Sequence, residues 1–261
     1  MEDALSEPLS TTMTVRGIRP GPAPSRPAPA PNASVVSGFG GQLAGLIADR
    51  TVPSTQVRFD AGTSIYGGGP HPDESVYLLT AGRAKTVMYS RSGRRCLLRI
   101  HSPGEVLGEL AILGGERTET AIAMSPSVVQ RVAVSHLLRL MGSPAVHRHL
   151  IRHLGERLAE QQRAISHLVG DDSEHRLGVT LLDLAERLGK PERDAEHDAV
   201  RIAQRITQEE LAGMVGTTRS RIGFFLRRFQ ECGAVEFSRG HVIRVRSQRL
   251  GDYLESRLDA C

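Results

Sequence analysis

An arginine-rich stretch at residues 206–233 holds the side chains whose types and spacing could do chemistry. Arg219 stands between the hydroxyl residues Thr218 and Ser220, and Arg227 follows about two helical turns later. A guanidinium can hold the O6 and N7 atoms of guanine with two hydrogen bonds, and a hydroxyl can reach a base or a phosphate. These residue types in this arrangement favour contacts to double-stranded DNA.

The same stretch predicts two short helices joined by a tight turn. Thr207 and Glu210 have the spacing of a capping box at the start of the first helix, and Gly216 ends it. In the second helix, four apolar residues fall at positions i, i+3, i+4 and i+7, which makes one buried stripe. This layout is typical of a helix-turn-helix, whose second helix enters the major groove. The stripe consists of Ile222, Phe225, Leu226 and Phe229.

Charge favours this interpretation over an ordinary helical hairpin with a solvated basic face. Residues 217–249 contain eight arginines and two glutamates, so their net charge is +6. Residues 171–198 have the opposite balance, with four basic and nine acidic side chains. The positive charge is therefore concentrated where phosphates would lie. The residues expected to contact DNA are Thr207, Gln208, Thr218, Arg219, Ser220, Gly223, Phe224, Arg227, Arg239 and His241.

Short strands and glycine-rich turns fill residues 52–134, at intervals typical of a small antiparallel barrel or roll. A hairpin at residues 234–247 would complete a winged helix. We therefore predict an α+β fold: an antiparallel β-roll, a long helix and a C-terminal winged helix-turn-helix. The tail before the roll is rich in Pro and Ala, so we expect it to be disordered. The predicted domains are residues 1–38 (the tail), 39–142 (the roll), 143–170 (the long helix) and 171–261 (the winged helix).

The long helix carries an apolar seam. From His147 onward, the seam positions are spaced alternately four and three residues apart. A seam of this kind usually pairs with a copy of itself, although the helix could instead pack on its own domain. The polar Gln161 within the seam can fix its register. The residues expected at a dimer contact are Ile151, Leu154, Leu158, Ile165 and Leu168.

Composition excludes several classes of protein. The three scattered cysteines, Cys96, Cys232 and Cys261, argue against a disulfide framework or a zinc site and favour a reducing cytoplasm. The sequence has no metal-ligand cluster, nucleophile elbow or recognisable carboxylate pair, so we expect neither an enzyme nor a metal site. No apolar run is long enough to span a bilayer, and the N-terminus does not have the pattern of a secretory signal. We therefore expect no membrane partner.

The order of roll, long helix and winged helix resembles the CRP/FNR family of bacterial transcription regulators. One motif that carries the resemblance is PGEVLGELA at residues 103–111, followed by ERT at residues 116–118. The other is TQEELA at residues 207–212, with VGTTR at residues 215–219. The resemblance covers residues 39–249. It implies that the roll is a cyclic-nucleotide-binding-like domain and that the chain regulates transcription.

The first motif is similar to the phosphate-binding cassette of cyclic-nucleotide domains. The resemblance implies that Glu109 accepts a ribose hydroxyl, that Arg117 pairs with the phosphate and that Thr118 donates its hydroxyl. Gly108 would allow close approach of the backbone, and a short helix beginning near Leu110 would offer its N-terminal amides to an anion. In the family, side chains of the long helix complete the ligand face. The corresponding residues of this sequence are Gln161 and Gln162.

The sequence departs from the cyclic AMP pattern at three points. The interval from Glu109 to Arg117 is shorter than the family's usual spacing. Glu119 stands where the family commonly has a small apolar residue, and it brings negative charge near the expected phosphate. Gln161 and Gln162 replace small hydroxyl residues. The effector is left open: cyclic AMP, another cyclic nucleotide, or none, with Glu109 and Arg117 forming an ion pair that closes an empty roll.

We expect a cytoplasmic, homodimeric, sequence-specific DNA-binding regulator of transcription that is controlled through its roll. Its two winged helices would occupy half-sites of a pseudo-palindromic operator, and RNA polymerase would be a further partner. A ligand at the junction of the roll and the long helix would change the spacing of the winged helices, with motion at residues 169–172. The alternative is a sensor or interaction module that does not regulate by binding DNA. Its roll would be unliganded or would bind another effector, such as cyclic di-GMP.

Overall fold

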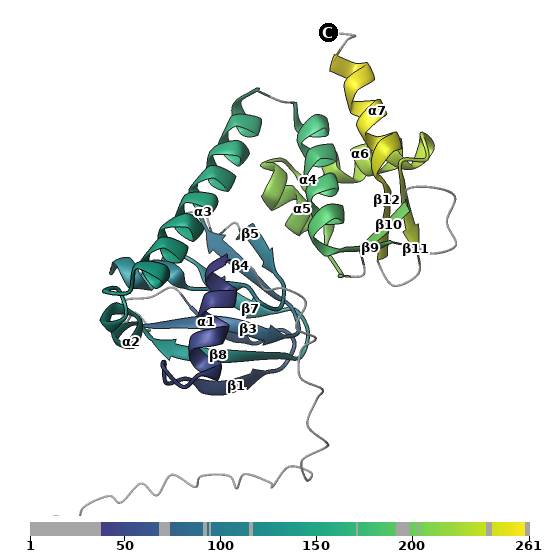
Figure 1. Ribbon diagram of the computed structural model, residues 1–261. Helices are drawn as coiled ribbons and strands as arrows, with labels where there is room; N and C mark the ends of the chain where they lie inside the picture. Colours follow the sequence, from purple (N-terminus) through teal and green to yellow (C-terminus); the bar gives the residue numbers. More distant parts are fainter. Residues whose placement is uncertain are drawn as a thin grey trace, which may run out of the picture. The chain divides into compact units, whose positions relative to one another are not determined.

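The structure is a computed structural model in which the elements run from α1 (Gly38–Ala48) to α7 (Ser247–Leu258), as Figure 1 shows. Most of the predicted tail, residues 1–37, lies outside the part of the chain that the structure describes. The described residues are 38–67, 74–90, 93, 95–114, 117–170, 172–191, 199–202, 204–238 and 242–258.

The roll is built from β1 (Thr55–Phe59), β2 (Ser64–Tyr66), β3 (Ser75–Ala81), β4 (Ala84–Tyr89), β5 (Arg95–His101), β6 (Val106–Leu107), β7 (Thr120–Ala123) and β8 (Ser127–Ala133). These strands form two antiparallel sheets. One sheet has the strand order β1-β8-β3-β6, and the other has the order β2-β7-β4-β5. The predicted roll is therefore confirmed.

Strand β3 shows how the sheets bury their side chains. Successive side chains of a strand point to opposite faces. Tyr77 and Leu79 pack in the cluster that holds the two sheets together. Val76 and Leu78 pack instead with α1 and with two further helices, α2 (Val134–Arg139) and α3 (Pro144–Gly170). Helix α1 and the first half of α3 thus cover an outer face of the roll, and α3 is the predicted long helix.

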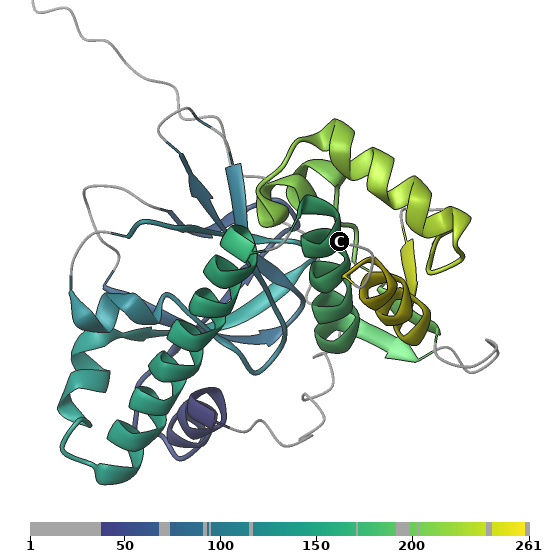
Figure 2. The same cartoon turned by 90° about the horizontal axis from the view of Figure 1, so that it is seen from above.

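Residues 173–258, which we call the head, form the predicted winged helix. Its helices are α4 (Ser173–Leu188), α5 (Gln208–Val215), α6 (Arg219–Glu231) and α7. Its sheet has the order β11-β12-β10-β9, where β11 is Val235–Ser238, β12 is Val242–Arg246, β10 is Ala199–Ile202 and β9 is Gly189–Pro191. Figure 2 shows α6 along the edge of the head. The four residues of the predicted stripe on α6 are buried in the core of the head.

One local prediction was wrong. Residues 189–200 were expected to form a polar loop, but they include β9 and the start of β10, which pairs with β12 in the register Ala199↔Arg246. Strands of three or four residues are too short to show an alternation of apolar and polar residues. They form because neighbouring strands of the fold pair with them. The short helix expected near Leu110 is present as a 3₁₀ helix, Glu109–Leu113 (η1).

The described ranges contain neither a membrane span nor a metal site. Within them, no helix is long and apolar enough to cross a bilayer. In the same ranges, no group of three or more His, Cys, Asp or Glu residues is placed to hold a metal ion.

Candidate nucleic-acid interface and nucleotide cassette

The turn between α5 and α6 is set by local hydrogen bonds. The Thr207 hydroxyl accepts from the Glu210 amide at 3.2 Å, and the Glu210 carboxylate accepts from the Thr207 amide at 2.9 Å, so the predicted capping box is present. Gly216 ends α5 with φ of 69°, a left-handed conformation that glycine adopts without strain. The Thr218 hydroxyl then accepts from the Arg221 amide and caps α6.

The start of α6 presents an exposed polar surface. Because the apolar stripe holds the other side of α6 in the core, this side faces outward. Thr218 and Ser220 lie 3.1 Å apart, hydroxyl to hydroxyl, on either side of Arg219. Phe224 keeps 51% of its surface exposed, a large apolar area for a polar face. The exposed residues of the predicted DNA-contacting set are Thr207, Gln208, Thr218, Arg219, Ser220, Phe224 and Arg227.

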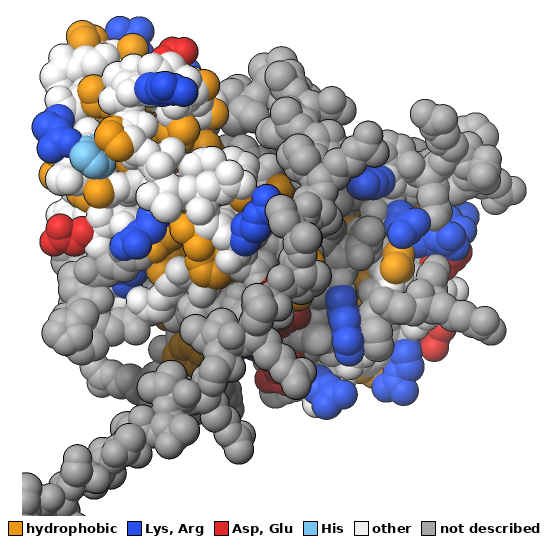
Figure 3. Space-filling model, turned by 90° about the horizontal axis from the view of Figure 1, so that it is seen from below, with side chains coloured by type: hydrophobic (Ala, Val, Ile, Leu, Met, Phe, Trp, Pro, Cys, Tyr) orange, Lys and Arg blue, Asp and Glu red, His pale blue; other side chains and the backbone are white. Residues whose placement is uncertain are grey.

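Gln208 and Gly223 bring α5 and α6 together at this surface. A Cβ atom on the half-buried Gly223 would stand 3.4 Å from Oε1 of Gln208. Arg239 and His241, predicted at the tip of the wing, lie outside the described residues. Figure 3 shows Lys and Arg side chains gathered at its right-hand side, where Figure 1 places β9, β10 and β12.

Arg228 has a structural contact that the sequence did not predict. Its guanidinium lies 2.9 Å from Glu174 of α4, and the same carboxylate accepts from the Tyr253 hydroxyl of α7 at 2.8 Å. Glu174 is 4% exposed, so this buried carboxylate ties α4, α6 and α7 together. On the sequence alone, Arg228 would be a solvated basic residue.

Helix α5 is held against the roll by Glu210. Its carboxylate forms an ion pair with Lys85 of β4 and lies 3.7 Å from the guanidinium of Arg95 in β5. Backbones also approach closely here, since a Cβ atom on Gly213 would stand 2.9 Å from the carbonyl oxygen of Arg95. Burial acts to raise the pKa of Glu210, but Lys85 and the Thr207 amide hold it below its ordinary value.

In the cassette, the carboxylate of Glu109 contacts two side chains of α3. Its Oε1 lies 3.2 Å from Nε of Arg157 and 3.3 Å from Nε2 of His153. The Glu109 side chain is only 12% exposed. Burial acts to raise the pKa of this carboxyl, but the contact with His153 and the charge of Arg157 lower it to about 2.

Arg157 belongs to a wider ionic network between the roll and α3. It also lies 3.4 Å from Glu160 and 3.9 Å from Glu105. Arg99 of β5 pairs with the same two carboxylates. Sequence reasoning missed Arg157 and Arg99. Arg157 could have been found, because it lies one turn after Leu154 on the side of the long helix that faces the roll.

Arg117 is buried against the backbone of the cassette. Its guanidinium donates to the carbonyl oxygens of Ser75 and Gly108, the latter at 3.5 Å. It also lies over the Tyr66 ring, 4.2 Å from the centroid. Gly108 has φ of 74°, and a Cβ atom there would stand 2.4 Å from Nη1 of Arg117. The arginine therefore fills the space that the glycine leaves.

Glu119 is a further partly buried carboxylate of the cassette. The Tyr66 hydroxyl donates to Oε1 of Glu119 at 2.6 Å. Burial raises the pKa of Glu119, and the charge of Glu109 adds to this effect. The remaining predicted ligand residues are exposed, so they do not share the burial of Glu109 and Arg117. These residues are Leu110, Thr118, Gln161 and Gln162.

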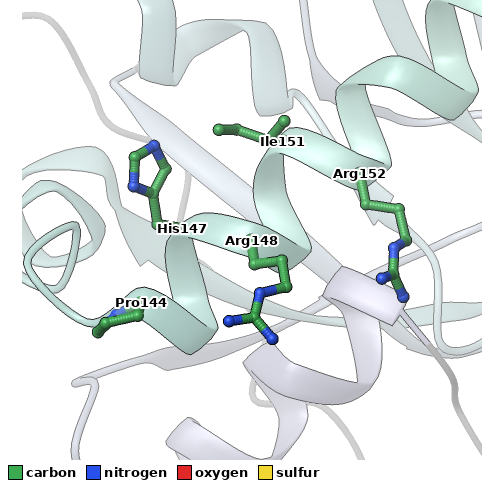
Figure 4. A pocket seen from close by; sticks show the side chains of 5 residues that line it. All are labelled: Pro144, His147, Arg148, Ile151 and Arg152. Carbon is green, nitrogen blue, oxygen red and sulfur yellow. The ribbon is translucent and has the colours of Figure 1, made fainter.

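The outward side of α3 carries apolar side chains seven residues apart. Ile151, Leu158 and Ile165 are 59%, 57% and 60% exposed, whereas Leu154 packs partly on the roll. A shallow pocket lies on the first turns of this helix beside Ile151. Figure 4 shows the side chains that line it, and the two arginines among them, Arg148 and Arg152, project to the same side of the helix. The lining residues are Pro144, His147, Arg148, Ile151 and Arg152. Of the predicted seam, the Leu168 side chain lies outside the described residues.

Comparison with known proteins identifies both parts of the chain. Residues 56–143 match the cyclic nucleotide-binding domain, and residues 175–253 match the Crp-like helix-turn-helix domain. A CRP-like cAMP-activated global transcriptional regulator of Mycobacterium tuberculosis is 30% identical over 216 residues, which cover 81% of this chain and 93% of that protein. The crystal structure of a CRP/FNR family regulator from Thermus thermophilus is 27% identical, with a TM-score of 0.63. It covers 78% of this chain and 100% of that chain.

These matches, on a chain with an exposed polar face on α6, define a DNA-binding regulator of transcription. The chain belongs to the CRP/FNR family, whose members are regulators and not enzymes. A helix-turn-helix in this family implies DNA binding and a dimeric architecture. The alternative of a sensor module that does not act on DNA is therefore not favoured. The domain limits and the individual site residues remain predictions.

Proposed function

We propose that the chain acts as a homodimer that reads a two-fold-symmetric DNA site, with Arg219 making the principal base contact. The observation that carries this proposal is the exposure of Thr218, Arg219 and Ser220 at the first turn of α6, opposite the buried stripe. In a helix-turn-helix the first residues of the second helix contact base edges. An arginine there can hold guanine bidentately and so reject other bases.

The other exposed residues have positioning roles in this proposal. Thr207 and Gln208 at the start of α5, and Arg227 two turns into α6, contact phosphates. Phe224 contacts a thymine methyl group, since its ring is half exposed. Arg239 and His241 are proposed as further phosphate contacts from the sequence alone.

Pairing of α3 supplies the second reading surface. The exposed stripe of Ile151, Leu158 and Ile165 has the period at which helices pack against a copy of themselves. A two-fold axis along such a seam gives two heads, which suits a pseudo-palindromic operator with half-sites about one helical turn apart. RNA polymerase remains a partner proposed from the family resemblance.

The test begins with selection of binding sites from a random duplex pool by the wild-type protein. Affinity is then measured for the selected site and for variants that change one base pair. Arg219→Ala should weaken binding by about 10- to 100-fold and should erase the preference at one guanine. Arg163→Ala, on the exposed side of α3, is the matched control and should bind like the wild type. Unchanged specificity in Arg219→Ala would refute this role for Arg219.

A further inference from the structure

The side chains that the family motif directs toward a cyclic nucleotide already have partners within this chain. Glu109, which would accept a ribose hydroxyl, is held by Arg157 and His153 of α3. Arg117, which would pair with the phosphate, donates to the carbonyl oxygens of Ser75 and Gly108. A ligand would have to replace both sets of contacts within one small volume.

The space beside Gly108 shows what the position of Arg117 means for a ligand. A glycine with a left-handed backbone at this position would let a phosphate approach the main chain. Here Nη1 of Arg117 takes that space, at 2.4 Å from where a Cβ atom would stand. The guanidinium also lies over the Tyr66 ring, 4.2 Å from the centroid. As they lie here, the residues present leave no space beside Gly108 for the phosphate that the family motif implies.

The negative charges of the cassette also disfavour a bound cyclic nucleotide. Glu119 lies directly before β7, and its pKa is raised by burial first and then by the charge of Glu109. A cyclic phosphate would add a third negative charge to this half-buried group. Like charges at short range in a medium of low dielectric repel strongly.

We infer that the cassette of this chain is closed from within: Arg157 of α3 holds Glu109 where a ligand would, and the site takes no cyclic mononucleotide. Helix α3 is then fastened to the roll without an effector. If the proposed DNA-binding function is correct, DNA affinity should not respond to such nucleotides. The closure itself does not depend on that function.

Titration calorimetry on the full chain tests the binding step without DNA. Cyclic AMP and cyclic GMP are each titrated into the wild-type protein. The expected result is no saturable binding at one nucleotide per chain with a Kd below about 100 μM. Binding of either nucleotide with that stoichiometry and a lower Kd overturns the inference.

A double-mutant cycle tests the internal tie, again without DNA. Urea midpoints are measured for Glu109→Gln, Arg157→Ala and the double variant. If the two side chains hold each other, the double variant should be destabilised clearly less than the sum of the two single effects. The same cycle with Arg163→Ala in place of Arg157→Ala is the control and should be additive. Additive effects for Glu109 and Arg157 would overturn the inference, whatever the protein does with DNA.

Discussion

Lys85 of β4 forms an ion pair with Glu210, the same carboxylate that completes the capping box of α5. Lys85 belongs to the nucleotide-binding domain and Glu210 to the helix-turn-helix domain. The Glu210 side chain is 3% exposed and the Lys85 side chain is 15% exposed, so the pair lies largely out of water. One residue thus starts the first helix of the DNA-binding motif and fastens it to the roll.

Replacing this carboxylate should cost stability. Glu210→Gln removes the charge that Lys85 pairs with and weakens the cap on α5, so we expect the free energy of unfolding to fall by about 1–3 kcal/mol. Chemical denaturation followed by circular dichroism measures the change. Glu209→Gln, at the exposed neighbouring position, is the control and should stay within about 0.5 kcal/mol of the wild type. Equal destabilisation in the two variants would show that Glu210 has no special role.

Acid should loosen the network around Glu109. Glu105 and Glu109 both have pKa values of about 2 in the folded chain, below the ordinary value of 4.5. The unfolded chain therefore binds more protons than the folded chain between these values, and stability falls as the pH drops from about 4.5 to about 2. For Glu109 we expect a contribution of roughly 1–3 kcal/mol, which is fully present above pH 4.5.

Urea unfolding at a series of pH values checks this prediction. Glu109→Gln should flatten the dependence in that window, whereas Glu156→Gln, an exposed change on α3, should leave it as in the wild type. The comparison of variants is needed because Glu119 acts in the opposite direction. Burial raises its pKa, so its own contribution favours folding at low pH. A dependence that Glu109→Gln does not alter would contradict the assignment.

A charge in the α3 seam should separate the subunits. Leu158 is 57% exposed in the single chain, so Leu158→Glu should leave each chain folded. In a dimer the two carboxylates would face each other in an apolar contact, which should raise the dimer Kd by at least about tenfold. Sedimentation at several concentrations measures the shift. Ser166→Glu adds the same charge one residue beyond the seam position Ile165 and should have little effect.

The salt dependence of DNA binding should report phosphate contacts. Arg227→Ala should weaken binding to all sequences alike, because a phosphate contact carries no base information. The slope of log K against log salt should become shallower by roughly one unit for each phosphate interaction that the substitution removes. Fluorescence anisotropy at a series of salt concentrations gives the slope. Weakening confined to one base pair of the operator would instead make Arg227 a base-reading residue.

Local signals explain what the sequence could predict. The capping box of Thr207 and Glu210, the left-handed Gly216 and the stripe on α6 each depend on residues a few positions apart. Propensity and periodicity act over that range, so the helix-turn-helix was predictable in detail. The same reasoning gave α3, because its seam repeats along a single helix.

The closure of the cassette was beyond such reasoning. Glu109 and Arg157 are 48 residues apart, and their contact exists because α3 packs on the roll through Leu150 and Leu154. The expected alternative gave Glu109 a partner in Arg117, but the structure shows the carboxylate with Arg157 and His153. Motif residues can be named from sequence, whereas the side chains that compete for them come from distant elements.

The carboxylate of Glu174 connects the start of α4 to α6 and α7 through its contacts with Arg228 and Tyr253. Glu174 lies in the first turn of α4, four residues after the end of α3 at Gly170. It forms an ion pair with Arg228 in the last turn of α6. Helix α6 has 13 residues and is therefore about 20 Å long. Because Arg228 lies in the last turn of α6, a change in the direction of α4 would be passed through this contact to the helix that carries Arg219.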